Sequence, residues 1–196
     1  EQQLRQAGGA GHVLDAACGT GMHAVALAKR GFKTAGADLY DGMIARAQVN
    51  ATTAGVDVPF EVTGFGELAQ RFGHSPLFPF DALFCLGNSL PHLLTPAALA
   101  EGLADFAACL RPGGLLLIQN RNFEAVMTTH ERWMEPQSHR EGSREWLFIR
   151  SYDYKTDGSI RFNIITLRRE GEGEWRQQVT STSLHPLLQD ELLKAL

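Results

Sequence analysis

The sequence predicts an α/β domain built on an open, mostly parallel sheet, with an antiparallel three-stranded unit inserted after the fifth strand. Two observations carry this prediction. Between Gly11 and about Asn120, short apolar runs alternate strictly with runs of helical spacing, as in parallel sheets with right-handed crossovers. After Asn120 the alternation stops, and longer strand-like runs follow one another with no helix between them. Such runs, joined by short turns, pair antiparallel.

The first part of the chain contains five expected strands and four expected helices. The strands are expected at residues 12–16, 33–38, 59–63, 81–86 and 115–119. The helices are expected at residues 21–30, 41–54, 66–72 and 96–110. Gly31 and Gly55 follow two of these helices, and glycine is a common residue just past a helix end. The run 81–86 is apolar throughout, as expected of a parallel strand covered on both faces.

The later strands are expected at residues 146–154, 159–169 and 175–184, separated by the turn-like stretches "KTDGS" and "EGEGE". A last helix is expected over residues 185–196, with Pro186 near its start. We therefore expect a core at 1–123, an inserted sheet on the substrate side at 124–184, and a helix at 185–196 that returns to the core.

Composition narrows the class of partner. The chain has 196 residues and a formal net charge of −4, without a basic cluster, which argues against a nucleic-acid partner. Its three cysteines form no CxxC pair, so neither a disulfide framework nor a metal site is expected. Residues 1–7 are polar rather than a signal peptide, and no apolar run is long enough to span a bilayer. A cytoplasmic protein with a small-molecule partner is expected.

The stretch "VLDAACGTG" at residues 13–21 is the strongest local motif. Gly19 and Gly21 follow the first expected strand and open the first helix, so backbone N–H groups and missing side chains leave room for a ligand. A P-loop is excluded, because Met22 and His23 follow where Lys and Ser/Thr are required. The spacing Gly19-x-Gly21-x-x-Ala24 also satisfies a dinucleotide turn.

Two acidic residues help to distinguish between the two ligands that remain, NAD and S-adenosylmethionine. Asp38 ends the second expected strand and can accept hydrogen bonds from ribose hydroxyls, which NAD and S-adenosylmethionine both present. Asp15 precedes the glycines, where it would repel a pyrophosphate but would attract the ammonium of a sulfonium cofactor. This asymmetry favours S-adenosylmethionine. An NAD-dependent oxidoreductase remains an alternative, although no Tyr-x-x-x-Lys pair supports it.

Four stretches together carry a resemblance: "VLDAACGTG", "GADLYDGMIARA", "FDALFCLGNSLPHL" and "LRPGGLLLIQNRNFE". The chain resembles a class I S-adenosylmethionine-dependent methyltransferase over residues 11–123, most of all the glycine/sarcosine N-methyltransferase group. The resemblance implies a Rossmann-like sheet and S-adenosylhomocysteine as product. Two strands of the usual seven and the amino-terminal extension of that group are missing, so we expect a truncated domain.

The resemblance also implies roles in cofactor binding. Ala17, Gly19 and Gly21 would surround the methionine part, and Asp38 would hold the ribose diol. Leu39 would pack on the adenine and Met43 would cover its other face, with membership of the helix core as the alternative for Met43.

Further along the chain, Leu86 would offer its carbonyl to the cofactor's ammonium. Gly64 and Phe65 stand where the family has an acidic or amide residue followed by an aromatic. Recognition of the adenine N6 amino group would therefore rest on backbone or water.

On the acceptor side, the resemblance implies Asn88, His92 and Arg121 as the catalytic residues. Asn88 would position the amine, and Arg121 would bind a carboxylate with its two-pronged guanidinium. His92 would accept a proton or, alternatively, serve only to hold its loop. The group has Asp-His where this chain has Gln119 and Asn120, and it often has Tyr at the position of Phe123, so the acceptor need not be glycine.

The implied function is N-methylation of a small, amino-acid-like acceptor. Two alternatives stay open: methylation of another small molecule at oxygen or carbon, and a cofactor-binding domain without turnover.

Overall fold

The computed structural model describes residues 11–196, and the expectation for residues 1–7 lies outside this range. The described chain forms two compact units. The first contains residues 11–90, 96–121 and 195–196, and the second contains residues 91–95 and 122–194. This division differs from the expected one mainly in that 91–95 and most of the last helix lie in the second unit. No helix among the described residues is long and apolar enough to cross a membrane.

The first unit is built on the predicted parallel sheet, with strand order β3-β2-β1-β4-β5. Its strands are β1 (His12–Asp15), β2 (Lys33–Asp38), β3 (Phe60–Val62), β4 (Phe80–Cys85) and β5 (Leu110–Ile118). Its helices are α2 (Met22–Ala28), α3 (Asp41–Ala54), α4 (Leu68–Phe72) and α5 (Pro96–Cys109). All neighbouring strands are parallel, so their carboxyl ends line one edge of the sheet, where open α/β sheets bind ligands.

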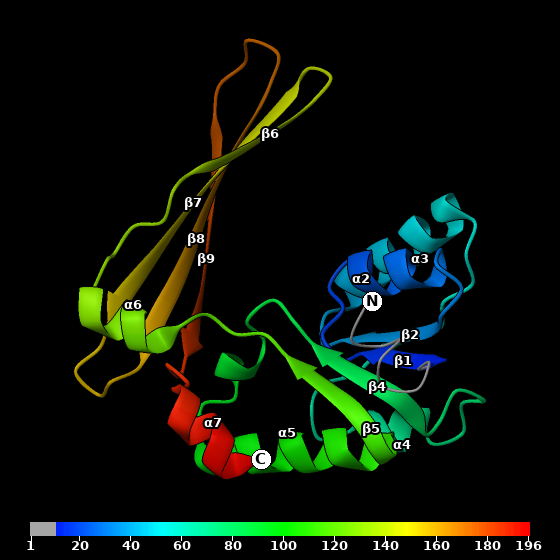
Figure 1. Cartoon of the computed structure of the whole chain (residues 1–196). Coiled ribbons are helices and arrows are strands. Elements are labelled where there is room, and N and C mark those ends of the chain that lie inside the picture. Colours follow the sequence, from blue (N-terminus) through cyan, green and yellow to red (C-terminus); the bar gives the residue numbers. More distant parts are fainter. Residues whose placement is uncertain (1–10) are drawn as a thin grey trace. The chain divides into compact units, whose positions relative to one another are not determined.

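Apolar side chains on both faces hold the sheet to its helices. Figure 1 shows α2 and α3 on one face and α5 on the other. On the first face, Ala24, Ile44 and Ala47 pack with Phe60 of β3. Cys85 and Cys109 are fully buried and serve here as small apolar residues. Burial raises the pKa of each thiol to about 12.

The start of β5 differs from the prediction. Residues up to Leu110 were expected in a helix and the strand from residue 115. Instead Leu110 already pairs with Phe80, and Leu115 pairs with Ala82. The intervening "RPGG" forms an irregularity inside the strand, with Gly113 at a φ of 74°. The sequence signal of a turn was therefore correct, but tertiary pairing continues on both sides of it.

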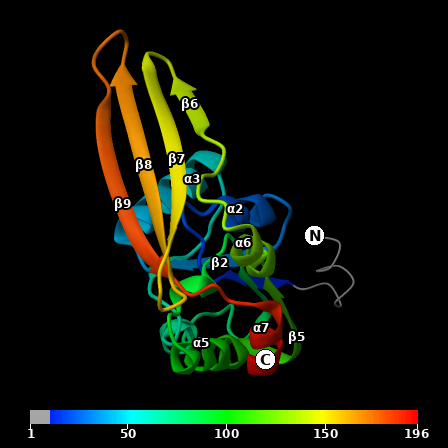
Figure 2. The ribbon, with the colours of Figure 1, turned by 90° about the vertical axis from the view of Figure 1, so that its left-hand side faces the viewer.

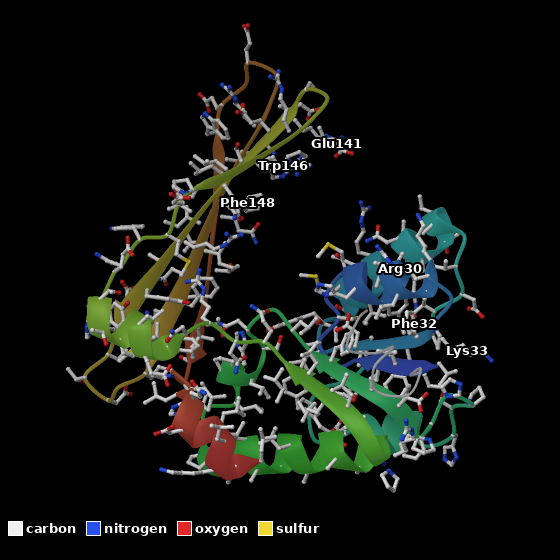
Figure 3. All side chains as sticks on the ribbon, in the orientation of Figure 1. Arg30, Phe32, Lys33, Glu141, Trp146 and Phe148 are labelled. Atoms are coloured by element: carbon white, nitrogen blue, oxygen red, sulfur yellow. The ribbon has the colours of Figure 1, made fainter. Side chains whose placement is uncertain are left out.

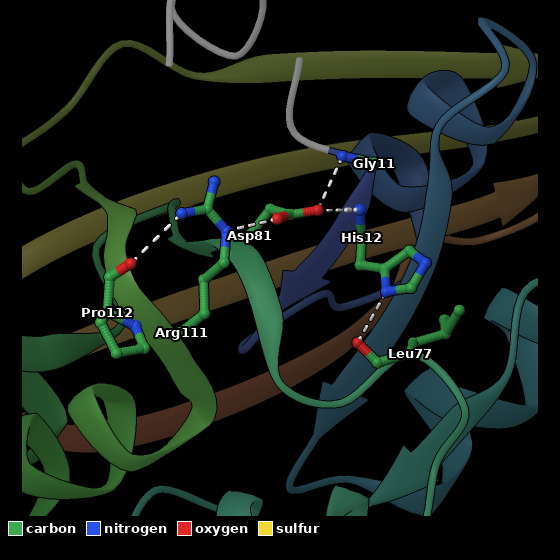
Figure 4. A network of polar contacts seen from close by, with 6 residues as sticks. All are labelled: Gly11, His12, Leu77, Asp81, Arg111 and Pro112. Atoms are coloured by element: carbon green, nitrogen blue, oxygen red, sulfur yellow. Dashed lines mark hydrogen bonds and ion pairs between the residues drawn. The ribbon is translucent and has the colours of Figure 1, made fainter. Parts of the chain in front are cut away.

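A network around Asp81 joins three strands at the amino-terminal edge of the sheet (Figure 4). One carboxylate oxygen accepts the N–H groups of Gly11 and His12 at 2.8 and 2.9 Å, and the other pairs with Arg111 Nε at 2.6 Å. Burial alone would raise the pKa of Asp81, but the hydrogen bonds from Arg111, His12 and Gly11 outweigh it and lower the pKa.

The variant Asp81→Asn should reduce the free energy of unfolding by about 1–3 kcal/mol, because it puts an N–H donor against other donors. Since the carboxylate's pKa is depressed in the folded state, its contribution exists above the unfolded pKa of about 4 and is lost at lower pH. Urea denaturation at pH 7 and pH 3 measures this. A stability difference that is as large at pH 3 as at pH 7 would contradict the assignment.

The second unit contains a four-stranded antiparallel sheet, not the expected three-stranded one (Figure 2). Its strands are β6 (Gln137–Glu141), β7 (Arg144–Tyr154), β8 (Ile160–Glu170) and β9 (Arg176–Leu184). The missed strand β6 has the sequence QSHRE and is fully exposed, so no apolar alternation marks it. It forms because a tight turn at Gly142 folds it back onto β7.

Two short helices complete the second unit. Helix α6 (Phe123–Thr129) was not expected, although Asn122 caps it by accepting the Ala125 N–H at 3.0 Å. Its Phe123 is fully buried against Tyr152 of β7. The last helix, α7 (Gln189–Ala195), begins four residues later than predicted. In the segment before it, the His185 N–H is bonded to the carbonyl of Pro91 and the Leu187 N–H to the carbonyl of His185.

Candidate active site

Asp15 is the most unusual residue at the carboxyl edge of the parallel sheet. It ends β1 and is 1% exposed, yet neither carboxylate oxygen has a hydrogen-bond partner among the described residues. Burial raises the pKa of Asp15 to about 7; the backbone N–H of Ala24 in the first turn of α2 opposes this shift, and the negative charge of Asp38 adds to it. The Ala24 N–H does not reach hydrogen-bond geometry with either oxygen, and a buried carboxylate with so little compensation is costly. A cationic ligand group would supply the missing partner.

The two glycines after Asp15 have different tasks. A Cβ added at Gly19, where φ is +54°, would meet nothing within 4 Å, so the space over this residue is open. At Gly21 a Cβ would lie 2.9 Å from both Ala47 Cβ and Phe60 Cζ. Gly21 is thus required for packing of the turn against α3 and β3, whereas Gly19 leaves room for a ligand. Ala17, between them and Asp15, is partly buried.

Asp38 at the end of β2 already organises the turn. Its Oδ2 accepts the Gly19 N–H at 2.8 Å and its Oδ1 accepts the Tyr40 N–H at 3.0 Å. Each carboxylate oxygen keeps acceptor capacity for a further hydroxyl group. The N–H of Gly19, which the sequence suggested as a ligand contact, is instead used inside the protein.

Exposed apolar side chains follow Asp38. Leu39 is 65% exposed and Met43, one helical turn later, is 44% exposed. Met43 therefore does not belong to the helix core, which α3 builds from Ile44, Ala47 and Ala51. Leu39, directly after Asp38, and Met43 thus leave apolar surface exposed.

The loop after β3 lies next to these residues. A Cβ at Gly64 would be 3.2 Å from Leu39 Cδ1, so the glycine permits close contact. Phe65 does not stand free: its ring meets the ring of buried Phe106 edge to face, with centroids 5.0 Å apart. Phe65 is therefore engaged with α5 through Phe106, and its place in the cofactor site remains a prediction.

The loops after β4 and β5 are joined by hydrogen bonds. Asn88 has a left-handed backbone conformation (φ 71°), and its side-chain oxygen accepts the backbone N–H of Arg121 at 3.0 Å. Gln119 accepts the Gly87 N–H at 2.9 Å through its side chain. The Leu86 carbonyl accepts the Ser89 hydroxyl at 3.1 Å and retains a second lone pair. Asn88, Arg121 and Leu86 are thus brought together at one end of the sheet.

His92 belongs to the second compact unit, whereas Asn88 and Arg121 belong to the first. It ends a short 3₁₀ helix, η1 (Leu90–His92), and its Nδ1 lies 3.5 Å from the Thr182 hydroxyl of β9. Partial burial lowers the pKa of His92 below its usual value, so the imidazole is neutral at pH 7 and can accept a proton.

Two residues that were not predicted to be site residues also have buried polar atoms without a hydrogen-bond partner among the described residues. The Thr63 hydroxyl is buried without a hydrogen-bond partner among the described residues, and so are both polar atoms of the Asn120 side chain. Thr63 follows β3 and Asn120 follows β5, so these groups also lie just beyond the carboxyl ends of strands. Polar residues directly after apolar strands were the only available sequence signal.

Two cavities lie away from these residues. One, of about 550 Å³, is lined at the amino-terminal edge of the sheet by Phe32 and Lys33, which Figure 3 labels. The other, of about 380 Å³, lies at the turn between β8 and β9, beside Arg169 and Trp175. Neither has a predicted site residue in its lining. The candidate site is therefore an edge of the sheet and not one of these cavities.

A family model described as a methyltransferase domain matches residues 13–114. The chain belongs to the methyltransferase domain family. The matched segment contains β1 to β4 and α5, and with them the glycine turn, Asp15 and Asp38. The match thus covers most of the parallel sheet of the first unit and ends inside β5.

Named relatives fit this family. The methyltransferase domain is similar to a glycine/sarcosine/dimethylglycine N-methyltransferase of Actinopolyspora halophila, with 38% identity over 65% of this chain and 22% of that protein. It is also similar to a glycine/sarcosine N-methyltransferase of Parasynechococcus marenigrum, with 34% identity over 61% of this chain and 41% of that protein. The chain spans less than half the length of these relatives.

A solved structure shares the whole fold. The sugar N-methyltransferase KedS8 from Streptoalloteichus matches all of this chain and 74% of its own, with a TM-score of 0.80 and 23% identity. At this identity the likeness concerns the fold, including the antiparallel sheet. The Rossmann-like methyltransferase architecture predicted from the sequence is confirmed.

Proposed function

We propose that the chain is the S-adenosylmethionine-binding part of a small-molecule methyltransferase, and that it transfers the methyl group to the nitrogen of an amino-acid-like acceptor. The observation that carries this proposal is the buried Asp15 carboxylate without a partner. A pyrophosphate would place negative charge beside it, whereas the ammonium of the cofactor's methionine part would satisfy it. The names of the curated relatives support an amino-acid acceptor.

The chain's own residues fit this cofactor. Asp15 would hold the ammonium together with the remaining lone pair of the Leu86 carbonyl, and the open space over Gly19 would admit the methionine part. Asp38 would hold the ribose hydroxyls with its remaining acceptor capacity. When bound, S-adenosylmethionine supplies an electrophilic methyl group on a positively charged sulfur.

The protein's task on the acceptor side is orientation and proton removal. Holding two reactants in line lowers the activation free energy by about 7–11 kcal/mol in favourable cases. Asn88 would orient the amine and Arg121 would bind a carboxylate of the acceptor, and the amine must also lose a proton before it attacks. Gln119 and Asn120 replace Asp-His of the related group, which keeps methylation at oxygen or carbon as a second candidate.

The deciding experiment is calorimetry of one sample with S-adenosylmethionine, S-adenosylhomocysteine and NAD. We expect both sulfur nucleosides to bind and NAD not to bind. Binding of NAD alone would overturn the proposal. A methyl-release assay with glycine, sarcosine and other amino acids then identifies the acceptor, and cofactor binding without turnover on any of them would favour a binding domain.

Arg121→Leu should raise the KM for the best amino-acid acceptor about 10- to 100-fold, because a charge-assisted bidentate bond is lost. The Kd for S-adenosylhomocysteine should stay within about threefold. The KM of Arg121→Lys for the acceptor should lie between those of wild type and Arg121→Leu, because lysine keeps the charge but not the two-pronged geometry. Steady-state kinetics with the acceptor and with its decarboxylated amine provides the measurement. An Arg121→Leu enzyme with unchanged KM for the amino acid would remove Arg121 from the acceptor site.

A further inference from the structure

Asp105 of α5 makes an unusual set of bonds to the loop after β3. Its side chain is nearly buried, and its Oδ2 accepts the N–H groups of Gly66 and Leu68, both at 2.8 Å. Its Oδ1 accepts the N–H of Ala69 at 2.9 Å. A residue some forty positions later in the chain thus caps the start of α4, a helix that has no side-chain cap of its own.

The loop that Asp105 holds is fixed at both ends. Before the loop, the Thr63 N–H donates to the Asp38 carbonyl at 3.1 Å, which continues the pairing of β3 with β2. After it, the Gly66 N–H is bound to Asp105, and the preceding Phe65 packs on Phe106, the neighbour of Asp105. The backbone of Gly64 and Phe65 is therefore suspended between two anchors.

This loop lies where a nucleobase would lie. Asp38 would hold the ribose, and the loop begins beside Asp38 and contacts exposed Leu39 through Gly64. Gly64 has no side chain with which to recognise a base. The polar groups that the loop can offer to the edge of a purine are its backbone N–H and C=O groups. The Gly64 carbonyl already accepts the Glu67 N–H at 3.4 Å and keeps one lone pair. The direction of these groups depends on the anchors.

We propose that Asp105 is a positioning residue for the cofactor's nucleobase, because it sets the backbone of the Gly64–Phe65 loop that selects adenine. This inference rests on the proposed function. Adenine donates from its N6 amino group and accepts at N1, whereas hypoxanthine accepts at O6 and donates from N1. A rigid backbone N–H and C=O pair distinguishes these two patterns, but a loop that can rotate does not.

The test compares the Kd values of S-adenosylhomocysteine and S-inosylhomocysteine by calorimetry on the full chain. Wild type should prefer the adenine compound about 30-fold, since two reversed hydrogen bonds cost about 1 kcal/mol each. Asp105→Asn should reduce this preference to about threefold or less, mainly by weakening the adenine compound.

Asp81→Asn is the matched control. Asp81 also accepts backbone N–H groups, but at the opposite edge of the sheet, so this variant should lose stability and keep the full preference. If Asp105→Asn does not fold, Phe106→Leu loosens the second anchor through Phe65 and should also reduce the preference, to about tenfold.

The outcomes separate the two proposals. A folded Asp105→Asn or Phe106→Leu variant that keeps the wild-type preference overturns the role of Asp105, and so does an equal loss in Asp81→Asn. A wild type that binds both compounds equally overturns nucleobase selection by this loop, although cofactor binding stands. A wild type that binds neither compound overturns the proposed function, and the inference with it.

Discussion

Asp15→Asn should weaken S-adenosylmethionine binding about 10- to 100-fold while making the ligand-free protein more stable. Asn keeps the shape of the side chain and one acceptor oxygen but loses the negative charge that pairs with an ammonium, and a charge-assisted bond of this kind contributes about 1.5–3 kcal/mol. The ligand-free protein gains stability because a buried ionisable group without a partner is removed. Calorimetry at pH 8 and urea denaturation give the two values.

The stability gain should depend on pH in a defined direction. The pKa of Asp15 is raised from 3.8 to about 7 by burial. A raised pKa means that the folded state binds the proton more tightly, so wild-type stability is greatest below pH 4 and falls as the pH rises to 7. The advantage of Asp15→Asn should grow over that interval by about 4 kcal/mol at most and stay constant above it.

An exposed aspartate provides the control. Asp157, in the turn between β7 and β8, accepts hydrogen bonds from the N–H and hydroxyl of Ser159, so Asp157→Asn should leave the cofactor's Kd unchanged. If Asp15→Asn bound S-adenosylmethionine as tightly as wild type did, the orphaned carboxylate would need another explanation.

Gly21→Ala should destabilise the domain by about 3–4 kcal/mol. The new Cβ would lie 2.9 Å from Ala47 Cβ and Phe60 Cζ, and the left-handed φ of +77° adds to the cost. Gly19→Ala should cost only about 1 kcal/mol, since its Cβ meets nothing within 4 Å. The order should reverse for binding, with Gly19→Ala weakening S-adenosylmethionine at least tenfold because the methyl group fills the open space.

Urea denaturation and calorimetry on both variants measure the two effects. Equal losses of stability at the two positions would contradict the separation of packing and binding roles. A Gly19→Ala protein with wild-type affinity would show that the open space over the turn is not used by the ligand.

The parallel sheet was predictable because its signals are local. Each strand is a short apolar run and each helix has its own spacing, so β2 and α3 were predicted with their observed ends. The antiparallel sheet was less predictable. Strand β6 carries no apolar pattern and is held only by pairing with β7. Helix α6 had a signal in the capping residue Asn122, which the preceding motif obscured.

The sequence identified candidate site residues where a charged side chain stands at the end of a predicted strand. Asp15 and Asp38 are acidic residues at strand ends, and both lie beside the glycine turn in the structure. Thr63 and Asn120 were missed because nothing in their letters shows that their polar atoms are buried without partners. The sequence predicts a ligand-binding role for Gly21, which stays a prediction, but it could not show that the missing Cβ is also needed for packing against Ala47 and Phe60.

The sequence alone determined the α/β class, most strands and helices of the first unit, and the presence of acidic residues at the carboxyl edge of the parallel sheet. These properties follow from the spacing of apolar residues and from residue type. Only the tertiary structure decided which glycine is open, which carboxylate lacks a partner and that Asp105 holds the loop after β3. These properties depend on atoms brought together from distant parts of the chain, as Asp105 and Gly66 are. Contacts between residues so far apart in the sequence cannot be read from the sequence itself.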